Sequence, residues 1–179
     1  MKRGFKVASG LLLAGALVLL AQVPRENFGL TVLLFSLAFG GMLVIYLLAS
    51  EEVDFKRLLL LGIVLRGCIF FFEPNWSEDG ARFLWDGELL REGYNPYGLT
   101  PTQVLEQQGE GSGLNTQLFQ DLNSPNYYSV YTPLNQAFFW LGALVGQGSV
   151  AQGYLAMRGM LLLGEIGVFY LLWSLLARF

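Results

Sequence analysis

The chain reads PNWSEDGARFLWDG over residues 74–87, between two hydrophobic blocks. This stretch begins where an apolar run of membrane-spanning length ends, and it combines carboxylates with arginine and tryptophan. Carboxylates at the water-facing edge of a bilayer are suited to work on a polar group that a lipid carries. We therefore expect residues 74–87 to begin the functional region, with membrane helices on both sides of it.

The composition is that of an integral membrane protein. Hydrophobic residues make up 54% of the 179 residues and charged residues 14%, and the mean hydropathy is +0.47. The single cysteine, Cys68, excludes an internal disulfide, and the absence of histidine excludes a His base or a His metal site. No basic block indicates a nucleic-acid partner. Acid–base chemistry therefore falls to Asp, Glu, Lys, Arg and Tyr.

Five apolar runs each have about the 20 residues that a helix needs to cross a bilayer core of about 30 Å. They lie at about 7–23, 28–49, 57–73, 132–150 and 154–177. The first run follows basic residues as a signal peptide would, but it lacks a clear cleavage site, so we expect a retained helix. The predicted fold class is all-α integral membrane, one domain over 1–179 with about five transmembrane helices.

Basic residues set the expected orientation, because cytoplasmic loops collect Lys and Arg. Five of them fall on one side of the predicted spans: Lys2, Arg3, Lys6, Lys56 and Arg57. The N-terminus is then cytoplasmic, the loop 73–132 is external and the C-terminus is external; Arg25 is the exception. Acids outnumber bases in that loop, so it could hold a divalent cation or deprotonate a sugar hydroxyl, although exported loops are also often acidic and simply solvated.

The loop has a helical pattern from Ser77, a predicted N-cap, to about Glu92. Its apolar stripe suits the headgroup boundary, which predicts an interfacial helix with a polar row on another face. The stripe is Ala81, Leu84, Trp85 and Leu89, and the row is Asp79, Arg82 and Asp86. Short helices are also expected from Thr100-Pro101 to Gly109 and over 114–122, and Thr132-Pro133 has the pattern of a helix start.

Five segments carry a resemblance to a known family. They read SED at 77–79, RFLWDG at 82–87, GYNPY at 93–97, NSPNY at 123–127 and YTPLNQ at 131–136. This order is similar to the first external loop of bacterial GT-C mannosyltransferases, which reads S-x-D-x-x-R-(F/Y)-x-W-D-G followed by N-P-Y. The likeness continues through Met157-Arg158 and residues 164–167. Family members are about twice as long or more, so the chain resembles the N-terminal part of a longer GT-C module with further transmembrane helices.

The resemblance implies transfer of mannose, or a related hexose, from a polyprenyl-phosphate donor to a glycan or lipid acceptor at the outer face of a bacterial cytoplasmic membrane. Asp79 matches the acid of the S-x-D triplet and is the expected base; capping the helix and pairing with Arg82 is its structural alternative. Glu78 is the alternate base, or with Asp79 a pair of metal ligands. The expected substrate contacts are Arg66, Arg82, Asp86, Tyr127, Tyr131 and Asn135, with Asp86 orienting Arg82 at i, i+4.

Two other classes of function stay open. A transporter or flippase component could use the intramembrane charges Arg66 and Glu165, but it predicts inverted repeats or broken helices, which the sequence does not show. A non-catalytic membrane assembly subunit would fold around partner helices and would tolerate loss of Asp79. No cofactor is certain from the sequence.

Overall fold

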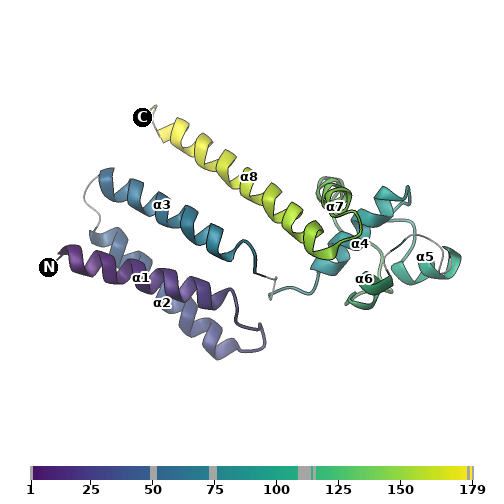
Figure 1. The fold of residues 1–179 in the computed structure, drawn as a ribbon, viewed down its shortest axis with the longest axis horizontal. Coiled ribbons are helices and arrows are strands. Elements are labelled where there is room, and N and C mark those ends of the chain that lie inside the picture. Colours follow the sequence, from purple (N-terminus) through teal and green to yellow (C-terminus); the bar gives the residue numbers. More distant parts are fainter. Residues whose placement is uncertain are drawn as a thin grey trace. The chain divides into compact units, whose positions relative to one another are not determined.

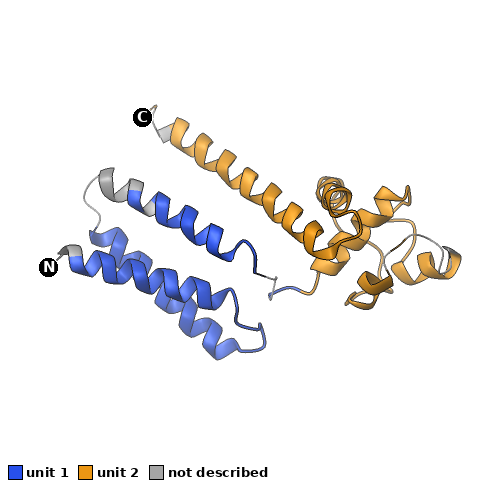
Figure 2. Ribbon diagram, viewed as in Figure 1, with its two compact units in different colours: residues 1–77 blue, residues 78–179 orange. Residues whose placement is uncertain are grey.

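The computed structural model describes residues 2–48, 52–72, 76–108, 114, 116–176 and 178. All regular structure in these ranges is helical. The chain divides into two compact units, residues 1–77 and 78–179 (Figure 2). Each unit is described by itself, so the prediction of a single domain over 1–179 stays a prediction.

The first unit holds three helices, α1 (Lys2–Leu20), α2 (Phe28–Leu48) and α3 (Glu52–Ile69). Helices α1 and α2 lie side by side (Figure 1). At Gly41 of α2 a Cβ would lie 3.0 Å from the Ser9 carbonyl oxygen, so glycine permits this close approach. After α3 the chain returns to α1, where the Trp76 indole donates to the Leu20 carbonyl oxygen at 3.3 Å.

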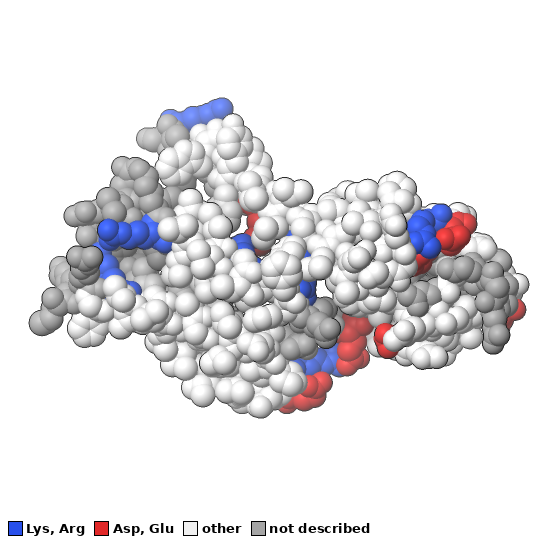
Figure 3. Space-filling view, viewed as in Figure 1, with Lys and Arg blue, Asp and Glu red and all other residues white. Residues whose placement is uncertain are grey.

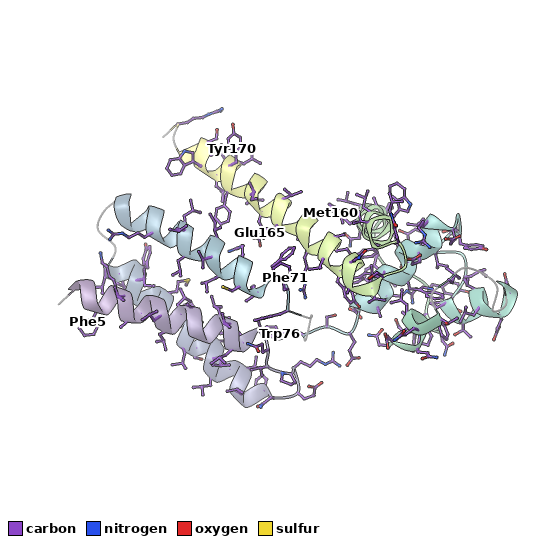
Figure 4. All side chains as sticks on the ribbon, viewed as in Figure 1. Phe5, Phe71, Trp76, Met160, Glu165 and Tyr170 are labelled. Atoms are coloured by element: carbon purple, nitrogen blue, oxygen red, sulfur yellow. The ribbon has the colours of Figure 1, made fainter. Side chains whose placement is uncertain are left out.

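Two of the described helices, α2 and α8 (Val150–Leu176), are long and apolar enough to cross a membrane. Residues 161–175 of α8 are exposed almost throughout, as expected of a helix in lipid and unlike the core helix of a soluble protein. Their side chains, Tyr170 among them, project away from the helix (Figure 4). Helices α1 and α3 contain shorter apolar stretches, Gly4–Leu20 and Leu59–Ile69. A membrane protein is plausible on this structure, but it does not show five spans.

The second unit is built around α4 (Gly80–Arg91), whose apolar stripe is its core. The stripe packs on α5 (Pro101–Gln108), on α6 (Thr116–Gln120) and on residues that flank α6. The buried residues of this core are Ala81, Leu84, Trp85, Leu89, Val104, Leu114, Leu118 and Leu122. The expected exposure of the stripe to headgroups is therefore wrong, because protein covers the stripe.

Helix boundaries in this unit test the predicted signals. The predicted N-cap at Ser77 is wrong: α4 begins at Gly80, and the backbone of Asp79 before it is already helical (φ −73°, ψ −11°). The short helices exist, although α6 covers only part of 114–122, and residues 109–113 lie outside the described ranges. The predicted start at Thr132-Pro133 is confirmed, since the Thr132 side chain accepts the Asn135 N–H.

The span predicted at 132–150 is not supported, because the helix there is too short. Helix α7 (Pro133–Gly146) has 14 residues. At 1.5 Å per residue it is about 21 Å long, against the roughly 30 Å of a hydrocarbon core. It ends at Gln147 and Gly148, both with positive φ (47° and 88°), a left-handed turn that stops a helix.

Glycines let α7 approach both of its neighbours closely. A Cβ at Gly87 of α4 would lie 2.2 Å from the Phe139 carbonyl oxygen, and one at Gly146 would lie 2.9 Å from the backbone nitrogen of Gly153 in α8. At Gly142 a Cβ would meet the Met157 side chain at 2.6 Å. Helix α7 is thus fixed along one side by α4 and α8.

We expect Gly87→Ala to destabilise the second unit by the upper end of the roughly 1–3 kcal/mol typical of overpacking. The added methyl would meet backbone, which cannot rotate away as a side chain can. Thermal unfolding in detergent should show the loss. Gly98→Ala is the control, because its Cβ would first meet the Asn95 side-chain nitrogen at an ordinary 3.6 Å. Equal melting temperatures for the two variants would contradict the close approach of α4 and α7.

Candidate functional site

A buried ion pair lies on α4. The Arg82 Nε donates to Asp86 Oδ1 at 2.8 Å, and the two side chains are 3% and 0% exposed. The predicted i, i+4 pairing of Arg82 with Asp86 is confirmed. Because both charges are out of water, the pair needs further hydrogen bonds to offset its desolvation.

The second carboxylate oxygen of Asp86 supplies two of those bonds. Ser129 Oγ donates to Asp86 Oδ2 at 2.5 Å, and Gln136 Nε2 donates to the same oxygen at 2.9 Å. The Gln136 amide also reaches Ser129 Oγ at 2.7 Å. Asp86 therefore joins α4 to α7 and to the segment before α7.

Arg82 also bonds to the segment before α7, through a second guanidinium nitrogen. Its Nη1 donates at 2.9 Å to two main-chain carbonyl oxygens, those of Ser124 and Tyr127. Arg82, Asp86, Ser129 and Gln136 thus form one buried network, which fixes the chain over 123–131 onto α4. Both side chains are buried and bonded to protein groups, and the predicted substrate contacts of Arg82 and Asp86 stay a prediction.

Asp79 lies at the edge of this network, directly before α4. The Asn123 side-chain amide donates to Asp79 Oδ1 at 3.0 Å, and the Asp79 side chain makes no capping bond to α4. Asp79 therefore occupies the N-cap position of α4 without the side-chain cap bond of the structural alternative, and its pairing with Arg82 stays a prediction. Its side chain is partly exposed, and it joins the start of α4 to the start of the fixed segment.

Tyr131 lies close enough to Asp79 to feel its charge. Burial raises the pKa of the Tyr131 phenol most, the negative charges of Asp79 and Asp86 raise it further, and Arg82 lowers it. The ring meets Phe83 and Phe139 edge-on, at centroid distances of 5.1 and 5.3 Å. The raised pKa favours the neutral phenol, and the ring is packed between two other aromatic side chains.

The remaining predicted site residues are Tyr127, Glu78, Asn135 and Arg66. Tyr127 is 71% exposed, on the segment that Arg82 holds, and Glu78 is exposed beside Asp79. Asn135 is exposed in the first turn of α7, where only its backbone N–H bonds Thr132. Arg66 lies in the last turn of α3, in the other unit, so a site shared with Asp79 stays a prediction.

Sequence reasoning missed Asn123, Ser129 and Gln136 as members of the site. Gln136 had a readable signal, because it shares the buried face of an otherwise apolar helix with Phe139, Ala143 and Gly146. A buried amide at that spacing needs a polar partner. The pairing of Asn123 with Asp79 spans residues far apart in the chain and has no local signal.

The part of the chain that the structure describes has no cluster of metal ligands. No group of three His, Cys, Asp or Glu residues there lies close enough to hold an ion. The divalent metal that the sequence left open would rest on Glu78 and Asp79 within this part.

Glu88 is a buried carboxylate outside the network. It lines a small cavity at the turn between α7 and α8, and it pairs with Arg91 at 2.7 Å. Burial raises the pKa of Glu88 most, Arg91 lowers it, and Glu92 raises it. The ionised form is thus less favourable than in a solvent-exposed Glu, despite the ion pair.

We expect Glu88 to contribute stability at low pH that is lost as pH rises, because its pKa is raised in the folded protein. A group whose pKa is higher in the folded protein than in the unfolded chain stabilises the fold fully at pH values below its unfolded pKa. This stabilisation is lost as pH rises through its folded pKa. The melting temperature of Glu88→Gln should therefore be at least that of wild type at pH 8. The difference between variant and wild type should be less favourable to the variant at pH 4. Arg91 also pairs with Glu92 at 2.9 Å, and we expect this pair to remain in the variant. A Glu88→Gln protein whose relative stability falls from pH 4 to pH 8 would contradict the shift.

No family model, no curated protein and no solved structure matches this chain.

Proposed function

We propose that this protein is a membrane glycosyltransferase of the GT-C type, or the N-terminal part of one. It transfers mannose or a related hexose from a polyprenyl-phosphate donor to a glycan or lipid acceptor. The site faces the outside of a bacterial cytoplasmic membrane, and the N-terminus is cytoplasmic. The proposal rests on the motif order of the sequence and on the surroundings of Asp79.

The observation that supports it best is the hydrogen bond from Asn123 to Asp79. This bond holds one carboxylate oxygen at 3.0 Å, while the side chain is partly exposed and does not cap α4. A general base needs a fixed carboxylate with access to substrate. The buried network beneath supplies the fixing, because it anchors the segment that begins at Asn123.

The proposed step is a displacement at the anomeric carbon. Asp79 takes the proton of an acceptor hydroxyl, and the acceptor oxygen forms a bond to C1 of the sugar. The bond between C1 and the phosphate oxygen breaks, and its electron pair leaves with polyprenyl phosphate. The exposed Tyr127 offers an aromatic face to the sugar, and Arg66 is the candidate cation for the phosphate.

The test is direct transfer in membranes. Membranes from cells that make the protein receive polyprenyl-phosphate mannose with a radioactive sugar, and label is followed into lipid and glycan fractions. Membranes without the protein are the control. Label that appears only with the protein supports the proposal. Equal incorporation in both would favour the non-catalytic assembly subunit, or a transporter component if labelled donor instead changes sides.

A further inference from the structure

We propose that α7 lies flat in the outer interface of the bilayer, with its exposed face in contact with lipid. This exposed face, here called the α7 apolar face, consists of Leu134, Phe138, Leu141 and Val145. The residues recur at i, i+4, i+7 and i+11, so they form one stripe along the helix. Leu134 and Val145 at its two ends are 68% and 60% exposed. The partner that this surface fits is a lipid bilayer. The outer side rests on the orientation in the proposed function, whereas the interfacial position does not depend on the proposed catalysis.

The opposite face of α7 cannot turn toward lipid, because it is packed in protein. Phe139 and Ala143 are 8% and 1% exposed, and Gln136 on the same face belongs to the buried network. Helix α4, on which α7 packs, carries Arg82, Asp86, Glu88 and Arg91. A crossing by α7 would take these charges into the hydrocarbon core, which is strongly unfavourable.

The contacts between α7 and α8 determine the depth at which α7 lies in the membrane. Gly146 and Gly142 of α7 meet Gly153 and Met157 of α8, the fourth and eighth residues of that helix. At 1.5 Å per residue these contacts lie about 5–10 Å from the start of α8. If α8 begins at the membrane surface, α7 lies at the depth of roughly 5–10 Å that interfacial helices adopt.

The lack of charged residues around α7 and its closeness in sequence to the candidate span α8 favour lipid over a soluble protein as its partner. The sequence has no charged residue between Asp121 and Arg158, a stretch that contains all of α7 and the loop before it. Val130, just before the helix, is 84% exposed. Only small parts of the visible surface are charged in Figure 3. An exposed surface this apolar, three residues from a candidate membrane span, is suited to the bilayer.

The geometry also places the Asp79 site near the headgroups. A Cβ at Gly80, next to Asp79, would lie 3.0 Å from the Tyr154 hydroxyl in the second turn of α8. The chain then returns across the membrane within α8, so its C-terminal end, with Arg178, is cytoplasmic. This agrees with the preference of basic residues for that side and differs from the external C-terminus expected from five spans.

Depth can be measured with a fluorescent label on single cysteines, in a Cys68→Ala protein reconstituted in phosphatidylethanolamine and phosphatidylglycerol vesicles. The α7 sites are Leu141→Cys and Val145→Cys, and the control is Glu106→Cys on the exposed side of α5. Nitroxide lipids labelled near the headgroup should quench both α7 sites more than lipids labelled near the chain end. Aqueous iodide should quench mainly the control.

Three quenching results would overturn the proposal. Stronger quenching by the deep nitroxide at both α7 sites would show a span. Iodide quenching equal to that at the control would show a water-facing helix, and no quenching by either agent would show a helix covered by protein. A second measurement uses Ser149→Cys in the turn between α7 and α8. A membrane-impermeant maleimide should label it in intact cells, and labelling only after permeabilisation would overturn the inference.

Discussion

Asp79→Asn is expected to lower sugar transfer by about 10²–10⁴, the usual loss when a positioned general base is removed. The amide keeps an oxygen that can accept the Asn123 N–H, now 3.0 Å from Oδ1. It cannot take a proton from an acceptor hydroxyl. Folding should be nearly unchanged, because the Asp79 side chain does not cap α4. The assay is mannosyl transfer in membranes that contain equal amounts of each protein.

The matched control for this prediction is Asp121→Asn, which makes the same chemical change at an exposed acid after α6. Its transfer rate should stay near that of wild type. Near-normal turnover with Asp79→Asn would remove Asp79 as the base and shift the role to Glu78. If Glu78→Gln and the double variant were also active, the region would be structural and the proposed mechanism would be wrong.

Local signals predicted the features that depend on neighbours in the chain. The run 28–49 is α2 within one residue, the cap at Thr132 begins α7, and the i, i+4 spacing of Arg82 and Asp86 gives their ion pair. Each of these depends on the properties of a helix turn. The sequence is sufficient there, because the interacting residues lie within a few positions of each other.

Tertiary packing explains why the other sequence predictions were wrong or missed. The period of Ala81, Leu84, Trp85 and Leu89 shows which face of α4 is apolar, but not whether lipid or protein covers it. In the run 132–150 the composition alone suggested a span. The pair Gln147-Gly148 was the overlooked stop signal, since both residues adopt positive φ. The Asn123–Asp79 bond depends on the folding of 123–131, which no local pattern encodes.

Asp86→Ala is expected to destabilise the second unit by about 3–5 kcal/mol, the usual effect of leaving a buried charge without its partner. The Arg82 side chain is 3% exposed, so bulk solvent has little access to the guanidinium that loses its carboxylate. Ser129 and Gln136 would lose their shared acceptor at the same time. Thermal and denaturant unfolding in detergent should both show the loss.

A double-variant cycle separates this network from simple loss of packing. If the unpaired guanidinium causes most of the effect, Arg82→Met combined with Asp86→Ala should be destabilised clearly less than the sum of the two single variants.

Asp86→Asn should be less destabilising than Asp86→Ala. Its oxygen can still accept from Arg82, and its new N–H can donate to Gln136 Oε1 after the Gln136 amide turns over, since that oxygen has no partner among the described residues. Additive losses in the cycle, or a loss below about 1 kcal/mol for Asp86→Ala, would mean that the segment 123–131 is held by packing. The anchoring of Asn123 beside Asp79 would then need another explanation.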